Sequence, residues 1–432
     1  MIRVNELMIY REFENDGIFR DMIWILENFE EAKEDPHQKA AIRELFYDVV
    51  HGLLEMAVSY GFEGNLWHNY LTYLLVNNEN AFSTSCEIRG MTEGSLKEIA
   101  KMDFAIFREL YRFDFAHLHE VLGTSETAIL RNFKGNGNSK LFNRRIRDRI
   151  CNLTLLLEQS RDEEEFMKDM VEFYREFGVG KLGLHKAFRV RHTEDGAVIE
   201  PVTNIAHVHL DDLVGYEHAK KKLIDNTEAF LNGKRANNCL LFGDAGTGKS
   251  SSIKGILNQY YDRGLRIIEI YKHQFQDLND VIAQVKNRNY KFIIYMDDLS
   301  FEDFEIEYKY LKAVIEGGLE KKPDNILIYA TSNRRHLVRE KFSDKEERRD
   351  DLHSSDTVQE KLSLVNRFGV QIFFCAPDKK EFQNIVRVLA QKHNITMPEE
   401  ELLLEANKWE LSHGGLSGRT AQQFIDYLSA KV

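Results

Sequence analysis

The spacing of hydrophobic and polar positions changes along the chain and divides it into two kinds of segment. In the first 200 residues, bulky apolar residues recur three and four positions apart, which is the spacing of one face of an α-helix. The clearest runs are FRDMIWILENFEEA (19–32), AAIRELFYDVVHGLLEMAV (40–58) and LTLLLEQSRDEEEFMKDMVEFYREF (153–177). The pattern predicts a mostly α-helical N-terminal domain over residues 1–186, and no motif in it indicates a chemical role.

From residue 238 onward, short apolar runs alternate with segments of helical spacing. The runs that predict strands are CLLFG (239–243), RIIEIY (266–271), YKFIIYMDD (290–298), NILIYATSN (325–333) and VQIFFCA (370–376). Nearly continuous apolar strands separated by helices are typical of a parallel sheet that is covered on both faces. We therefore expect an α/β domain with a five-stranded parallel sheet over residues 210–377. A connecting segment (187–209) precedes it and a helical lid of three or four helices (378–432) follows it.

Composition narrows the class of protein. A chain of 432 residues is too long to form one compact core, so two or three domains are expected. Its 43% hydrophobic and 30% charged residues are typical of globular domains. No run approaches the ~18 apolar residues of a membrane helix, and the N-terminus lacks the apolar region of a secretory signal. Four scattered cysteines without a C-x-x-C pair indicate neither a disulfide framework nor a zinc site. The expected location is the cytoplasm.

The charge distribution bears on the partners of the protein. The formal net charge is −12, yet residues 131–150 carry seven Lys or Arg and one Asp. Such a run is more often a solvated helix face, or is paired with neighbouring acids, than a nucleic-acid site. Nucleic acid therefore remains a weakly supported partner, and a protein client is the main expectation.

The stretch LLFGDAGTGKSS (240–251) has the spacing G-x-x-x-x-G-K-S of a phosphate-binding loop between a strand and a helix. Backbone N–H groups of such a loop converge on phosphate oxygens, and the helix dipole favours negative charge there. Lys249 is expected at the β- and γ-phosphates of ATP, and the Ser250 hydroxyl on Mg²⁺. The residues expected to surround the phosphates are Gly243, Asp244, Ala245, Gly246, Thr247, Gly248, Lys249, Ser250 and Ser251.

Polar residues end the two strands that follow in the sequence at 290–298 and 325–333. Asp297 and Asp298 end the first of them, and Asn333 ends the second. Ligands of parallel α/β sheets bind at the carboxyl ends of strands. We expect Asp297 to hold the magnesium shell and Asp298 to orient or deprotonate the attacking water. Asn333 is expected to contact the γ-phosphate and that water.

The order of these motifs is similar to that of the AAA+ ATPases. The order is GDAGTGKS, IIYMDD, YATSN, a strand-preceding SLVNRFG and a late helix-opening GLSGRTAQQF. More closely, the stretches ANNCLLFGDAGTGKSS, YMDDLSFE, LIYATSNRRHL, EKLSLVNRFG and GLSGRTAQQFIDYL resemble an uncharacterised bacterial AAA+ family defined only as a domain of unknown function. The resemblance covers residues 205–432.

This resemblance implies roles for particular residues. Asn333 matches the first sensor, and Arg419, in SGR, matches the second sensor, which couples the lid to the nucleotide state. Arg367, in NRFG, matches an arginine that many AAA+ subunits project toward a neighbour's γ-phosphate; Arg334 and Arg335 are alternative donors. The residues that match the adenine-contacting segment are Leu213, Val214 and Gly215.

The resemblance implies a homo-oligomer that binds ATP and ADP with Mg²⁺ and hydrolyses ATP. Many AAA+ enzymes have glutamate at the position of Asp298, and the shorter aspartate makes slow, switch-like turnover one expectation. Replication initiators of the superfamily also carry Asp-Asp, so the sequence does not exclude hydrolysis. A nucleotide-gated binding module with little hydrolysis is the main alternative. A small-molecule kinase would leave Asn333, Arg367 and Arg419 unexplained. A protein-unfolding ring would need an aromatic-glycine pore loop, which the segment YKHQFQDL lacks.

Overall fold

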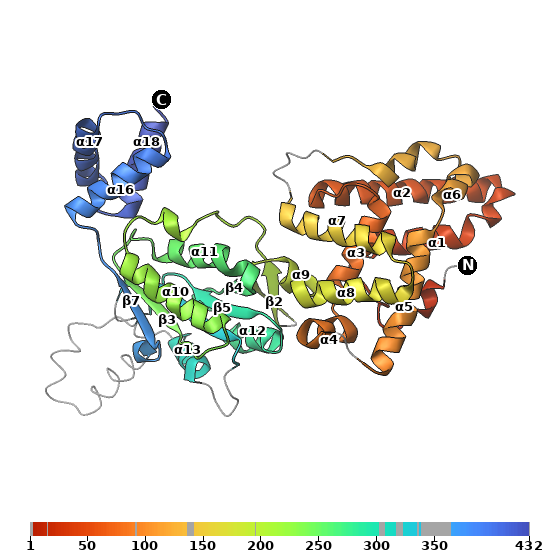
Figure 1. Cartoon of the computed structure of the whole chain (residues 1–432), viewed down its shortest axis with the longest axis horizontal. Coiled ribbons are helices and arrows are strands. Elements are labelled where there is room, and N and C mark those ends of the chain that lie inside the picture. Colours follow the sequence, from red (N-terminus) through yellow and green to blue (C-terminus); the bar gives the residue numbers. More distant parts are fainter. Residues whose placement is uncertain are drawn as a thin grey trace. The chain divides into compact units, whose positions relative to one another are not determined.

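The computed structural model describes residues 3–14, 16–90, 93–135, 142–194, 196–301, 307–316, 323–334, 337 and 364–431. The chain divides into two compact units, Met1–His185 and Lys186–Val432. Figure 1 shows helices throughout the first unit and a sheet with surrounding helices in the second. Within the described residues, none of the helices combines the length and apolar character needed to cross a membrane.

The first unit is helical, in agreement with the spacing of its apolar residues. One hydrophobic cluster, which includes Phe46, Leu71, Phe104 and Phe166, runs through the unit and buries the apolar faces of its helices. The α-helices are α1 (Gly17–Asn28), α2 (Pro36–Tyr60), α3 (Leu66–Asn77), α4 (Ala81–Arg89), α5 (Ser95–Arg112), α6 (Phe115–Leu122), α7 (Arg144–Gln159), α8 (Glu163–Phe177) and α9 (Gly180–Leu184). Short 3₁₀ helices are η1 (Val4–Glu6), η2 (Glu31–Lys33) and η3 (Ser125–Asn132).

The apolar run over residues 153–177 forms two helices, α7 and α8. The break has a local cause, because Asp162 caps the second helix and accepts a hydrogen bond from the backbone N–H of Glu165 at 2.8 Å. An aspartate at this position satisfies a donor that the helix itself leaves unpaired.

The second unit contains a seven-stranded sheet in the order β2-β1-β4-β5-β6-β3-β7. The five predicted strands are confirmed and run parallel to one another: β3 (Cys239–Gly243), β4 (Leu265–Glu269), β5 (Lys291–Met296), β6 (Ile326–Ser332) and β7 (Val370–Phe374). Strand β6 is buried along its whole length, as expected of a sheet covered on both faces. The helices α10 (Glu217–Leu231) and α11 (Lys249–Tyr260) share a hydrophobic core with one face of this sheet.

Two further strands extend the sheet beyond the five that were predicted. Residues within the expected connection 187–209 form β1 (Ala187–Thr193) and β2 (Gly196–Pro201), an antiparallel hairpin whose first strand pairs in parallel with β4. Phe188 and Val190 are buried, whereas Arg189 and Arg191 between and beyond them point outward. Such alternation is typical of a strand with one buried face. Here it spans only a few residues among charged neighbours, so the sequence pattern did not predict the strand.

The lid consists of α16 (Lys379–Lys392), α17 (Glu399–Ser412) and α18 (Gly418–Ser429) in the part of the chain that the structure describes. Asp378 and Ser417 cap the first and last of these helices through bonds to the N–H groups of Glu381 and Thr420. Phe382, Val386, Ala421 and Ile425 are among the residues that form the core of the lid. The remaining short elements of the unit are η4 (Leu210–Asp212), η5 (Tyr261–Arg263), η6 (Lys272–Asp277), α12 (Leu278–Val285) and α13 (Glu307–Glu316).

Candidate functional site

The register of three central strands brings the predicted polar residues to one edge of the sheet. Met296 of β5 pairs with Ala330 of β6, so the next residues, Asp297 and Thr331, are neighbours. Phe242 of β3 pairs with Ser332, so the loop after β3 begins beside Asn333. The carboxyl ends of β3, β5 and β6 therefore form the floor of a single site.

The loop between β3 and α11 has the backbone shape of a phosphate cradle. Gly243, Gly246 and Gly248 have φ values of 134°, 75° and 92°, a region that side chains other than glycine rarely adopt. A Cβ atom on Gly243 would lie 2.0 Å from the carbonyl oxygen of Phe374 in the adjacent strand β7. Glycine is therefore required at Gly243 by both conformation and space.

Lys249 begins α11 and is buried, with 6% of its surface exposed. Its ammonium group donates hydrogen bonds to the carbonyl oxygens of Gly243 at 2.9 Å and Asp244 at 2.6 Å. Burial lowers the pKa of Lys249, and the nearby carboxylates of Asp244, Asp298 and Asp297 oppose this change. The loop thus holds a cation against its own backbone, at the point where the helix dipole already favours an anion.

Three hydroxyl groups converge on one oxygen of Asp297. Oδ1 accepts hydrogen bonds from Ser250 at 2.7 Å, Tyr295 at 2.6 Å and Thr331 at 2.5 Å. Burial acts to raise the pKa of Asp297, but the hydrogen bonds from Thr331, Tyr295 and Ser250 outweigh it, and the pKa of the carboxyl group is lowered. Asp297 is therefore held as a carboxylate beside the Ser250 hydroxyl.

Asp298 has a φ of 48°, in the left-handed region that is unfavourable for most residues with a side chain. Its backbone N–H donates to Thr331 Oγ1 at 3.0 Å. Its carboxylate Oδ1 accepts a hydrogen bond from Asn333 Nδ2 at 2.7 Å. The second acid and the predicted sensor asparagine are thus in direct contact.

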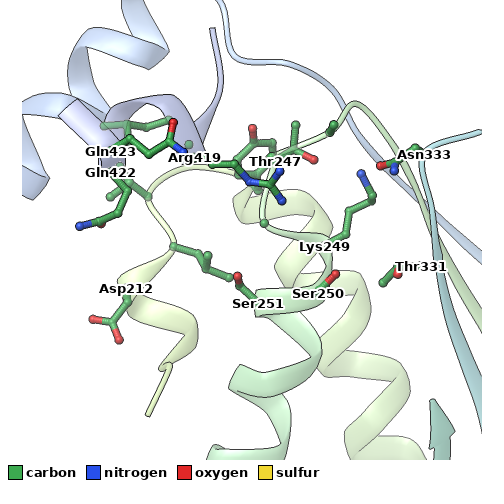
Figure 2. A pocket seen from close by; sticks show the side chains of 18 of the residues that line it. Asp212, Thr247, Lys249, Ser250, Ser251, Thr331, Asn333, Arg419, Gln422 and Gln423 are labelled. Atoms are coloured by element: carbon green, nitrogen blue, oxygen red, sulfur yellow. The ribbon is translucent and has the colours of Figure 1, made fainter. Parts of the chain in front are cut away.

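A cavity of about 640 Å³ lies above these residues and is closed on one side by the lid. Figure 2 shows Lys249 pointing toward Asn333 and Ser250 toward Thr331, with Arg419, Gln422 and Gln423 of α18 on the opposite side. The residues that line it are Asp212, Leu213, Val214, Tyr216, Ala245, Gly246, Thr247, Gly248, Lys249, Ser250, Ser251, Asp297, Asp298, Thr331, Asn333, Ile385, Leu389, Gly418, Arg419, Gln422 and Gln423. Its volume is in the range of ~300–1,000 Å³ that small-molecule sites occupy.

The lid contacts the phosphate loop directly. The backbone N–H of Arg419 donates to the carbonyl oxygen of Gly246 at 3.2 Å. A Cβ atom on Gly246 would lie 3.0 Å from Ser417 Oγ, so the small residue allows this close approach. A second bridge joins Lys392 of α16 to Asp212 at 2.9 Å, and this contact lowers the pKa of the Asp212 carboxyl group.

Most of the predicted site residues line this cavity, but a few lie elsewhere. Gly243 and Asp244 are not among the lining residues, and their carbonyl oxygens accept hydrogen bonds from the ammonium group of Lys249. Gly215 lines a separate cavity of about 470 Å³, which Val214 and Tyr216 also line. Arg334 is exposed and its backbone N–H donates to Ser332 Oγ. Arg335 lies outside the described residues.

Arg367 lies at the opposite end of the sheet from the phosphate loop. It precedes β7, whose first residue, Val370, pairs with Cys239 at the start of β3, whereas the loop follows Gly243 at the end of β3. Four steps along a strand cover about 13 Å. Arg367 therefore does not line the cavity of its own chain.

Several lining residues escaped the sequence prediction. Thr331 lies inside an apolar strand, and only the register of β6 against β5 shows that its hydroxyl group faces Asp297. Tyr295 is not among the lining residues; it lies two residues before Asp297 on the same side of β5, and its hydroxyl group donates to the same carboxylate. Ile385 and Leu389 of the lid form an apolar wall together with Leu213 and Val214. Their spacing on α16 is also that of ordinary core residues, so the sequence could not distinguish the two roles.

The donor set fits a magnesium nucleotide. A hydroxyl and a carboxylate are the hard oxygen groups that Mg²⁺ accepts together with substrate phosphates. The glycine cradle, the buried ammonium group and the apolar wall fit phosphates and a base. Together with the parallel sheet and the helical lid, these features define a P-loop nucleotide-binding protein of the AAA+ class.

Comparison with models of protein families assigns the chain to a family. The model of DUF815, a family described as proteins of unknown function, matches residues 183–432, and the chain belongs to this family. The match starts within three residues of the second unit and leaves out nearly all of the first. A search of curated proteins finds no match.

Solved structures that match part of this chain include a mutant of Thermotoga maritima RuvB and the FIGL-1 AAA domain in complex with ADP. The RuvB mutant is 17% identical with a TM-score of 0.36, and the alignment covers 50% of this chain and 64% of that chain. The FIGL-1 domain is 16% identical with a TM-score of 0.36, and the alignment covers 52% of this chain and 74% of that chain. Likeness at this level does not bear on the reaction or the partners.

Proposed function

We propose that this protein is a Mg²⁺-dependent ATPase that uses its nucleotide state to move its lid. The observation that carries the proposal is the 2.7 Å hydrogen bond between Ser250 and Asp297, in the same cavity as Lys249 and Asp298. A hydroxyl and a carboxylate this close can share one ion. The phosphate loop, the pair of acids and the sensor asparagine lie at the ends of three different strands, which supports a common ligand rather than separate structural roles.

Each part of the ligand has a matching group in the cavity. The N–H groups of the glycine-rich loop and Lys249 would hold the phosphates, and Ser250 and Asp297 would hold Mg²⁺. Leu213 and Leu389 belong to the apolar wall, which suits the adenine ring. When bound, Mg²⁺ neutralises charge on the phosphates and so favours attack by water.

Hydrolysis would depend on Asp298 and Asn333. The carboxylate of Asp298 would orient the attacking water or accept its proton, and the amide of Asn333 holds that carboxylate at 2.7 Å. Closure of the lid over the cavity would exclude other water molecules. Arg419 at the start of α18 would sense the phosphates, because its backbone already contacts the loop at Gly246.

The proposal is tested by measuring phosphate release from ATP by the purified chain, with Mg²⁺ and with EDTA. We expect Mg²⁺-dependent release, and tight binding of ATP and ADP. If ATP does not bind at millimolar concentration, the assignment of the cavity is wrong. If ATP binds but no phosphate is released, only the hydrolytic part fails.

A slow nucleotide-gated switch is a second candidate, and the geometry of Asp298 favours it. Aspartate is one methylene shorter than glutamate, and the carboxylate of Asp298 is already engaged by Asn333. Both features reduce the freedom of the acid to reach a water molecule. In this case ATP would set the position of the lid, and a partner would bind in the ATP state with little turnover.

We propose that Arg367 acts on a neighbouring copy of the chain in a homo-oligomer, because it lies too far from its own phosphate loop. Replacing Arg367 by alanine is expected to reduce ATP turnover by about 10³-fold, the usual contribution of such an arginine. An equimolar mixture of the Arg367→Ala and Asp298→Asn variants should regain about one quarter of the wild-type rate, because random head-to-tail assembly joins an intact acid to an intact arginine at that share of interfaces.

The mixing experiment has a matched comparison in Arg334→Ala. A mixture that stays inactive would contradict the role of Arg367 in a neighbour's site. If Arg334→Ala alone is inactive and its mixture with Asp298→Asn regains activity, whereas the Arg367→Ala mixture does not, the role belongs to Arg334.

We infer that the partner is a protein client, recruited by the helical first unit. The arginines of the basic stretch that the structure describes have local partners: Arg131 pairs with Asp114, Arg147 with Asp148, and Arg149 lies over the ring of Phe177 at 4.2 Å. Residues 136–141 of this stretch lie outside the described part.

The four cysteines are free, which suits a reducing compartment, and we therefore place the protein in the cytoplasm.

Because Arg131, Arg147 and Arg149 have partners within the protein, binding of single-stranded and duplex DNA is expected to be undetectable at physiological salt. The check is a titration of fluorescent oligonucleotides at 50 and 200 mM salt with ATP present. Binding driven by contacts to phosphates would weaken steeply over this range, by ~10³ or more for six contacts. Tight and salt-sensitive binding, lost when Arg144 and Arg145 are replaced by glutamate, would make nucleic acid the partner.

A further inference from the structure

Thr331, at the end of β6, contacts both acids of the site. Its hydroxyl group donates to Asp297 Oδ1 at 2.5 Å and accepts from the backbone N–H of Asp298 at 3.0 Å. Thr331 is 1% exposed, so bulk water cannot replace these two hydrogen bonds. A single buried hydroxyl group thus joins the side chain of one acid to the backbone of the next.

The backbone of Thr331 also takes part. Its carbonyl oxygen accepts from the N–H of Leu299 at 2.7 Å. The two N–H groups on either side of the Asp298 Cα therefore both bond to Thr331. Asp298 has a φ of 48°, a conformation that persists in a residue with a side chain only where the surroundings hold it.

The direction of the Asp298 side chain depends on this backbone. With both N–H groups fixed, the Asp298 carboxylate meets Asn333 at 2.7 Å and lines the cavity. In an ordinary extended conformation, the side chain after Asp297 would leave on the other face of the strand. The left-handed turn at Asp298 is what allows two consecutive acids to serve one site.

We propose that Thr331 is a positioning residue that fixes the placement of Asp298 relative to Asp297, and so sets the geometry between the magnesium site and the acid that activates water. The inference rests on the proposed function, because it assigns no ligand beyond Mg²⁺ and ATP. In this assignment Thr331 acts through its hydrogen bonds to the two aspartates. Tyr295 has a lesser role, since its hydroxyl group donates to the side chain of Asp297 and the backbone N–H of Asp298 bonds to Thr331 instead.

The test compares Thr331→Val with Thr331→Ser. Valine keeps the shape and the strand preference of threonine but removes the hydroxyl group. We expect kcat for ATP to fall by about 10- to 100-fold, as when residues that orient metal ligands are removed, with KM changed less than about threefold. Thr331→Ser keeps the hydroxyl group and should recover most of the rate.

Thr227→Val is the matched control. Thr227 is buried in α10, and its hydroxyl group bonds to the Leu223 carbonyl oxygen and to Tyr329 of the same strand β6. Its loss measures the cost of removing a buried hydroxyl group near β6 but away from the site. A similar fall in kcat in both variants, or no recovery in Thr331→Ser, would mean that Thr331 has only a structural role.

A second measurement does not require turnover. Binding of a non-hydrolysable ATP analogue is measured against Mg²⁺ concentration and in EDTA. We expect Thr331→Val to raise the Mg²⁺ concentration for half-maximal binding by about 10-fold and to leave binding in EDTA unchanged. Tyr295→Phe, which removes another donor to Asp297 and keeps the ring, should shift the same curve in the same direction.

The two measurements separate this inference from the proposed function. If the wild-type protein binds the analogue but never releases phosphate, the hydrolytic proposal fails, and the Mg²⁺ curves still decide the role of Thr331. If the Mg²⁺ curves of Thr331→Val and Tyr295→Phe coincide with that of the wild type, the inference is wrong even in an active ATPase. Should Thr331→Val fail to fold, Thr331→Ala, which also removes the hydroxyl group, takes its place in both measurements.

Discussion

The Asp298→Asn variant is expected to bind ATP with nearly wild-type affinity and to hydrolyse it about 10²- to 10⁴-fold more slowly, the usual range for loss of a general base. Asparagine tolerates the left-handed φ of 48° that Asp298 adopts. Its amide oxygen can still accept the hydrogen bond from Asn333. The fold and the cavity are therefore preserved, and only the charge and basicity of the acid are lost.

The measurement is single-turnover hydrolysis at saturating ATP, together with equilibrium binding of ATP. Asp225→Asn is a suitable control, since Asp225 is exposed on α10 and does not line the cavity. Hydrolysis at the wild-type rate in Asp298→Asn would show that another group activates water. If the variant does slow hydrolysis, it also becomes a trap that holds ATP and can be used to capture the client.

The Lys249→Ala variant is expected to lose nucleotide binding itself. A hydrogen bond to a charged group contributes about 1.5–3 kcal/mol, so loss of two bonds to phosphate weakens binding by about 3–6 kcal/mol, or at least 10²-fold. The Gly243 and Asp244 carbonyl oxygens that now hold the ammonium group would also lose their donor. Turnover at cellular ATP concentrations should then be undetectable.

Calorimetric titration with ATP and ADP checks this expectation. Lys254→Ala is the matched control, because Lys254 lies on the same helix α11 and is exposed. Equal affinity in the two variants would show that the cavity does not bind nucleotide through the loop. A selective loss in Lys249→Ala, combined with retained binding in Asp298→Asn, is the pattern that a P-loop ATPase requires.

The sequence predicted the central part of the fold well because local patterns encode it. Five apolar runs correspond to the five parallel strands, and the glycine spacing from Gly243 to Gly248 corresponds to positive φ angles in the loop. The hairpin of β1 and β2 escaped prediction, since its alternation is short and its strands form only by pairing with β4. Pairing partners far away in sequence leave no local signal.

In the candidate site, too, the residues that belong to local motifs were predictable and those that depend on distant pairing were not. Lys249, Ser250, Asp297 and Asn333 were predictable because their motifs place each at a strand end or a helix start. Thr331 was not, because a threonine within an apolar strand is ordinary. The predicted adenine contacts Leu213 and Val214 line the cavity, whereas Gly215 lines its neighbour.

By itself, the sequence determined which residues could bind phosphate and Mg²⁺, since the conformation of a glycine-rich loop and the chemistry of an ammonium group, a hydroxyl and a carboxylate are properties of a few adjacent residues. Only the tertiary structure decided which of them meet. The register of β5 against β6 places Asp297 beside Thr331, and the packing of the lid places Arg419 against Gly246. Such contacts between distant residues depend on how the apolar faces of strands and helices fit together, and this fit exists only in the folded chain.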